Sequence, residues 1–148
     1  MEEKLKQANV IETKKPGDSV VYKVPAAFAL LFDNTFSDDG MAAVIESAEE
    51  SDLLQVDDFA LRLANGAADR QEELDGRIEA AAHKWSMQRI SRVALAIMRL
   101  ALYEILYEEE IPTSVSINEA VELAKKYGCD EEATFVNGVL GGIVKAQS

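Results

Sequence analysis

The stretch ISRVALAIMRLALYEILY, residues 90–107, places apolar side chains on every face of a helix. Between residues 91 and 107 its only charged side chains are those of Arg92, Arg99 and Glu104. A helix that is apolar all round is either in a membrane or surrounded by other helices. This one is shorter than the roughly 20 apolar residues of a membrane span, and it carries charges well inside it. We therefore predict a buried central helix with Ser91 as its N-cap.

The flanking sequence predicts further helices around this segment. Apolar residues at helical spacing, bounded by capping or helix-breaking residues, occur near residues 26–36, 41–51, 57–67, 69–84, 114–127 and 130–143. Pro25 is predicted in the first turn of the first of these helices. Residues 1–22 are expected to form a loose N-terminal arm, with a short extended piece at residues 19–22, and residues 23–148 the helical domain. No hairpin signal is present, so we expect an all-α fold of six or seven helices.

Charge is distributed unevenly along the 148 residues, whose formal net charge is −12. Residues 24–61 hold nine acidic residues and no Lys or Arg, whereas residues 62–99 hold seven basic residues against five acidic ones. An acidic balance argues against general affinity for nucleic acid. No apolar run follows a basic N-terminus, and Cys129 is the single cysteine, so we expect a cytoplasmic protein without an internal disulfide.

The residues that enzymes commonly use are sparse. His83 is the single histidine and falls near a predicted helix end, where a surface or capping role is the ordinary one. One His and one Cys far apart in sequence make a zinc site improbable. Gly141 and Gly142 lack the lysine and spacing of a phosphate loop and indicate close helix packing instead. We expect no catalytic residue, no metal and no cofactor.

Four motifs together resemble the NusB transcription antitermination factor family. They are WSMQRIS (residues 85–91), AIMRLALYEIL (96–106), IPTSVSINEAVELAK (111–125) and FVNGVL (135–140). The resemblance, which runs through about residues 58–143, implies a non-enzymatic domain of about seven helices in two packed halves. It implies binding of boxA RNA together with a small-subunit ribosomal protein, NusE, and an indirect action on elongating RNA polymerase. Self-association as a homodimer is a further expectation, and no membrane partner is expected.

The first helix departs from the family pattern. Members usually open with an Arg-rich run, but residues 22–32 read YKVPAAFALLF, with Lys23 as the one cation. We therefore expect weak intrinsic RNA affinity. The candidate RNA contacts are Lys14, Lys15, Lys23, Arg89 and Arg92. The candidate partner contacts are Phe32, Tyr103, Glu104, Glu108, Asn118 and Glu119. Two functions remain open: an antitermination factor, or a divergent NusB-like protein-interaction module that has lost RNA binding.

Overall fold

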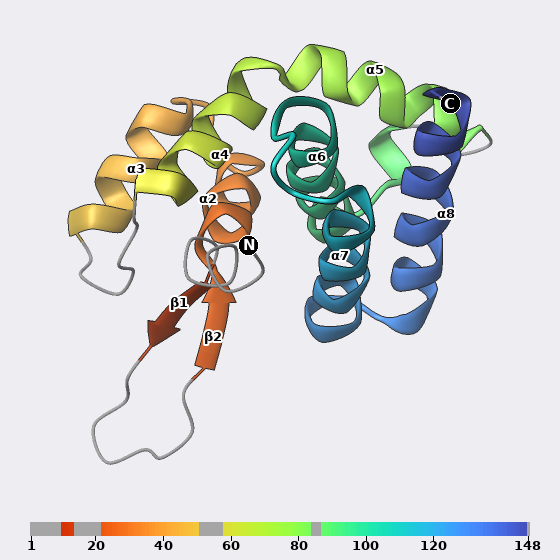
Figure 1. Ribbon diagram of the computed structural model, residues 1–148. Helices are drawn as coiled ribbons and strands as arrows, with labels where there is room; N and C mark the ends of the chain where they lie inside the picture. The colour runs from red at the N-terminus through yellow and green to blue at the C-terminus, as the bar shows by residue number, and fades with distance from the viewer. Residues whose placement is uncertain (1–9, 14–21, 51–57, 84–86, 148) are drawn as a thin grey trace. The chain divides into compact units, whose positions relative to one another are not determined.

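The computed structural model describes residues 10–13, 22–50, 58–83 and 87–147 of the chain (Figure 1). The chain divides into two compact units, Met1–Ala68 and Asp69–Ser148. The first unit contains β1 (Val10–Thr13), β2 (Tyr22–Pro25), α2 (Ala26–Asn34), α3 (Met41–Glu50) and nearly all of α4 (Asp58–Asp69). The second contains α5 (Gln71–Ala82), the short 3₁₀ helix η1 (Met87–Arg89), α6 (Arg92–Tyr107), α7 (Thr113–Tyr127) and α8 (Asp130–Gln147). The predicted helical class is confirmed.

A two-stranded antiparallel pair precedes α2 in the first unit, and the sequence reading did not predict it. β1 pairs with β2 so that Val10 lies opposite Pro25. Pro25 therefore ends a strand instead of entering the first helical turn, and α2 begins one residue later, at Ala26. Proline lacks an amide donor, which the end of a short edge strand tolerates. Of the extended piece expected at residues 19–22, residues 19–21 lie outside the described residues.

In this first unit, α2 packs against α3 and contributes five buried apolar residues, against three from α3 and four from α4. Leu30 and Leu31 are buried almost completely, as is Leu63 of α4. α2 ends at Asn34, two residues earlier than expected, and continues as a turn in which the Thr35 and Phe36 amides donate to the carbonyl oxygens of Phe32 and Asp33.

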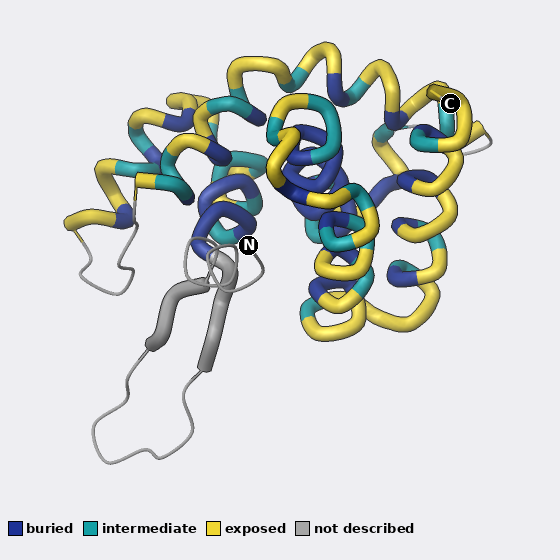
Figure 2. Tube along the Cα trace, viewed as in Figure 1, coloured by how far each residue is buried: buried dark blue, intermediate teal, exposed yellow. Residues whose placement is uncertain are grey.

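The second unit is arranged around α6, which packs against α5, α7 and α8. Ten of the 16 residues of α6 are buried, from Ala94 to Glu104, and they form much of the dark core seen in Figure 2. The Ala94 amide donates to Ser91 Oγ at 3.0 Å, so the predicted N-cap is confirmed. At the other end Glu108 is the C-cap, and a turn at residues 109–110 leads to Pro112, the N-cap of α7. The prediction of a buried central helix is therefore correct.

His83 and Gly128 mark the ends of two helices in this unit. His83 caps α5 with a positive φ of 51°, in agreement with the expected capping role. At Gly128, which follows α7, an added Cβ would approach Glu132 Oε2 to 2.7 Å, so only glycine fits without movement.

The prediction of close packing at Gly141 and Gly142 is wrong, because an added Cβ would meet nothing within 4 Å and both residues are exposed. They lie on the solvent face of α8, whose buried face is formed by residues such as Leu140 and Ile143.

Candidate protein and RNA interface

The five cations predicted to contact RNA fall into two groups. Lys14 and Lys15 lie outside the described residues, and Lys23 belongs to β2, of which the backbone alone is described. Arg89 ends η1 and Arg92 opens α6, and both are exposed. The second group thus gathers two guanidinium groups at one helix start.

Ser91 lies between these two arginines and organises the N-terminus of α6. Its hydroxyl accepts from the Ala94 amide and donates to Glu132 Oε2 at 2.9 Å, which ties the start of α6 to the first turn of α8. A helix N-terminus carries partial positive charge that favours anions. Here the carboxylate of Glu132 lies at the same helix start, and its negative charge opposes the binding of phosphate there.

Glu104, a candidate partner contact, is a core residue. Its exposed fraction is 5%, and burial raises the pKa of its carboxyl to about 8. The buried Ser116 hydroxyl of α7 lowers this pKa, although Ser116 Oγ has no partner at ordinary hydrogen-bond geometry. Glu119 and Glu108 raise it further. Three of the predicted partner contacts therefore meet at the α6–α7 packing surface, where Glu119 is exposed and Glu108 half-buried.

Tyr103, another candidate partner contact, forms part of an aromatic cluster between α5 and α6. It is largely buried and stacks on Tyr107, with ring centroids 5.4 Å apart. The Arg70 guanidinium lies 4.2 Å from the centroid of the Tyr107 ring, and the Tyr107 hydroxyl donates to Glu73. Tyr107 is 39% exposed, so it presents the outer surface of the cluster. The four-residue spacing of the tyrosines is readable in the sequence, but the approach of Arg70 is not.

Phe32 belongs to the first unit and is half-buried on α2. Its ring lies between those of Phe28 and Phe36, at centroid distances of 6.0 Å and 5.2 Å. Phe36 is 61% exposed, and burial raises the pKa of the neighbouring Asp33. This row of three aromatic side chains is thus buried at Phe28 and open to solvent at Phe36.

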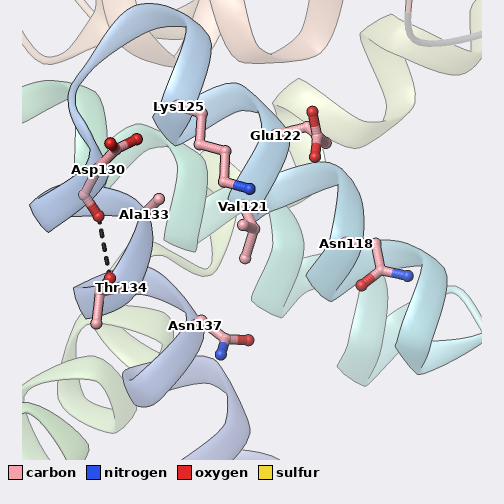
Figure 3. A pocket seen from close by; sticks show the side chains of 8 residues that line it. All are labelled: Asn118, Val121, Glu122, Lys125, Asp130, Ala133, Thr134 and Asn137. Carbon is pink, nitrogen blue, oxygen red and sulfur yellow. Dashed lines mark hydrogen bonds between the residues drawn. The ribbon is translucent and has the colours of Figure 1, made fainter.

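Asn118 lines an open groove of about 640 Å³ between α7 and α8 (Figure 3). Asn137 of α8 lines the same groove, and Glu122, Lys125 and Asp130 add charge to it. Both asparagines are exposed. The three charged residues were missed because each taken alone is an ordinary surface residue of a helix or a helix end.

Two kinds of site are not found in the part of the chain that the structure describes. No group of three or more His, Cys, Asp or Glu side chains there could hold a metal ion. Among the described helices, none has the length and apolar content that crossing a membrane requires. Cys129 is exposed at the α7–α8 link.

Comparison with known proteins identifies a family for this chain. A family model described as the NusB family matches residues 25–145. A transcription antitermination protein NusB of Clostridium botulinum is 39% identical over 132 residues, which cover 80% of this chain and 94% of the relative. A solved T. maritima NusB has a TM-score of 0.72 at 35% identity, covering 81% of this chain and 86% of that one. A crystal structure of antitermination factors NusB and NusE in complex with dsRNA has a TM-score of 0.71 at 27% identity, covering 82% and 92%.

Proposed function

This chain belongs to the NusB family, and we propose that it is a non-enzymatic transcription antitermination factor. In this proposal it binds boxA-type leader RNA together with the ribosomal protein NusE, acts on elongating RNA polymerase through that pair, and works in the cytoplasm. The observation that carries the proposal is the extent of the similarity. The match begins at the last residue of β2 and reaches the last turn of α8, so it spans both units.

The RNA affinity of the isolated chain is expected to be weak. α2 has no basic residue, and neither does the rest of the segment from residue 24 to residue 61. Each phosphate contact contributes to affinity by releasing condensed counterions, so a surface that lacks cations loses that contribution. A basic ribosomal partner would supply the missing charge, and an acidic chain of net charge −12 is electrostatically suited to such a partner.

A fluorescence titration of labelled boxA RNA tests the proposal, with the chain alone and with purified NusE at two salt concentrations. We expect weak binding by the chain alone and much tighter binding by the pair, with a steep loss of affinity at the higher salt concentration. A scrambled RNA of the same composition is the control. Equal affinity of the pair for both RNAs would contradict the function.

Removal of residues 1–23 tests where the chain touches RNA. The arm holds five lysines, including Lys14, Lys15 and Lys23, so the truncated chain should lose most of its residual RNA affinity and show a shallower salt dependence. The matched variant keeps the arm and replaces Arg89 and Arg92 by Gln. If the truncated chain bound RNA as well as the full chain, the contact would have to lie elsewhere.

The aromatic residues at the end of α2 and in the turn after it favour a second candidate, a NusB-like protein-interaction module without RNA binding. Phe36 is largely exposed beside Phe32, and neither residue has a basic neighbour on α2. In this alternative, a pull-down with the chain recovers a protein partner from a lysate treated with nuclease. A pull-down from an untreated lysate recovers no RNA. Self-association through α2 would appear as a concentration-dependent dimer in analytical ultracentrifugation, reduced by Phe36→Ser. Recovery of RNA without any protein would count against this candidate.

A further inference from the structure

The groove between α7 and α8 is lined mainly by polar side chains, two of which are asparagine amides. Asn118 stands on the α7 wall and Asn137 on the α8 wall (Figure 3). Both are exposed, and within the described residues neither amide makes a hydrogen bond. Thr134, by contrast, donates its hydroxyl to the Asp130 carbonyl at 3.1 Å and so serves its own helix. Asn is a poor helix former, so an asparagine at each of these mid-helix positions lowers the helix propensity, and no hydrogen bond of its amide offsets this cost.

The groove also contains three charged side chains. Glu122 and Lys125 of α7 and Asp130 of α8 form no ion pair with one another or with other described residues. Two carboxylates against one ammonium give the groove a negative balance. Val121 and Ala133 are also in its lining, half-buried and buried respectively, and supply an apolar floor.

The dimensions and chemistry of the groove match one class of ligand. From Asn118 to Lys125 the α7 wall rises seven residues, about 10 Å, which is the length of about three residues of extended chain. A side-chain amide offers a donor and an acceptor together, as a peptide group requires. The carboxylates of Glu122 and Asp130 are suited to Arg, whose planar guanidinium binds carboxylates in pairs of hydrogen bonds. RNA is disfavoured, because its phosphates would meet the same two carboxylates.

We propose that the α7–α8 groove binds an extended peptide segment of a partner protein, with Asn118 and Asn137 holding its backbone and Glu122 and Asp130 its basic side chains. This site goes beyond RNA and NusE recognition and does not depend on either. Successive side chains of an extended chain point to opposite sides. A segment with two adjacent Arg residues therefore presents one of them toward Glu122 on the α7 wall and the other toward Asp130 on the α8 wall.

The test is an NMR titration of the isotope-labelled full chain with the peptide acetyl-Ala-Arg-Arg-Ala-amide. We expect saturable shifts of the Asn118 and Asn137 side-chain amide signals, and no such shifts with acetyl-Ala-Glu-Glu-Ala-amide. A variant with Glu122→Gln and Asp130→Asn should bind the Arg peptide about tenfold more weakly, equivalent to about 1.4 kcal/mol. The matched control, Glu109→Gln with Glu131→Gln, removes two exposed carboxylates outside the groove lining and should bind as the parent does.

Three results would overturn the proposal. One is the absence of saturable shifts at the two asparagines with the Arg peptide. Another is an equal loss of affinity in the control variant, which would mean that the net charge of the chain, and not the groove, determines the affinity for the peptide. The last is a response to hexauridylate RNA without a response to the peptide, which would make the groove a nucleic-acid site. All the substituted side chains are exposed, so an unchanged backbone spectrum verifies the fold of each variant.

Discussion

The two buried charges of α6 lie five residues apart and are accommodated in opposite ways. Arg99 is 7% exposed, and its Nε and Nη2 donate to Oδ1 and Oδ2 of Asp75 at 2.8 Å each. Glu104, at 5% exposed, has no basic partner among the groups that affect its pKa, and that pKa is raised to about 8. One charge is neutralised by a partner and the other by keeping its proton. A buried ionisable group in a helical core can therefore be neutralised by an opposite charge or by a proton. Only neutralisation by a proton makes stability sensitive to pH near neutrality.

The largest effect is expected at the neutralised charge. Asp75→Asn removes the partner carboxylate and leaves the Arg99 guanidinium buried without a counter-charge. Loss of one member of such a pair costs about 3 kcal/mol of unfolding free energy, because the remaining charge is desolvated without compensation. Urea denaturation followed by circular dichroism measures it. Glu79→Gln, an exposed position on the same helix, is the control. A loss no greater than that of the control would mean that Asp75 contributes only as a surface residue.

The second effect concerns the protonated carboxyl of Glu104. Its folded pKa lies above the ordinary value of 4.5, so the folded state binds the proton more tightly than the unfolded state. The stability is therefore fully present below about pH 4.5 and is lost as pH rises toward 8, with a slope of up to about 1.4 kcal/mol per pH unit. Glu104→Gln should remove this slope. Unfolding free energies at pH 5, 7 and 9 measure it, with Glu109→Gln as the exposed control. Parallel curves for parent and variant would contradict the raised pKa.

A smaller effect is expected at the N-terminus of the same helix, where no buried charge is involved. Ser91→Ala removes the cap of α6 and the hydrogen bond to Glu132, and loss of an N-cap typically costs about 1 kcal/mol. Thermal unfolding at pH 6 measures it. Ser91→Asn, which restores a capping oxygen, should recover most of the loss. If it recovered none, the contact with Glu132 would be the larger of the two contributions.

The smallest effect sharpens the contrast at Glu104. Ser116→Ala removes a buried hydroxyl that has no partner at ordinary hydrogen-bond geometry, so the unfolding free energy at pH 6 should change by less than about 1 kcal/mol. The pKa of Glu104 should rise further, because the hydroxyl lowers it. Carboxyl carbon chemical shifts followed against pH report that pKa directly. A lower pKa in the variant would reverse the role given to Ser116.

Most of the helical architecture was readable from the chain because it rests on local rules. The all-round apolar pattern of residues 90–107 predicted the buried helix, and Ser91 predicted its cap. Pro25 shows where such rules fail. Its backbone suits either a first helical turn or the end of a strand, and the pairing with Val10 that settles the choice is not visible in the local sequence.

The site was less predictable than the fold. The four family motifs pointed to the NusB family, and Asn118, Glu104 and Tyr103 were selected from the same motifs. The chain alone did not distinguish the exposed amide from the two buried residues, because all three lie in amphipathic or apolar helical patterns. No local pattern marked Arg70 or Lys125 as a site residue, because Arg70 contacts tyrosines of α6 and Lys125 shares its groove with residues of α8.

Residue order by itself determined the helical class, the buried α6 and the family, because apolar periodicity, capping and motif spacing act within one helix or its ends. Tertiary structure alone decided the fate of the charges: that Arg99 meets Asp75, that Glu104 is enclosed beside Ser116, and that Asn118 faces a groove shared with Asn137. The physical reason is that burial and pairing depend on which helix packs against which. That arrangement is set by surfaces far apart in the chain.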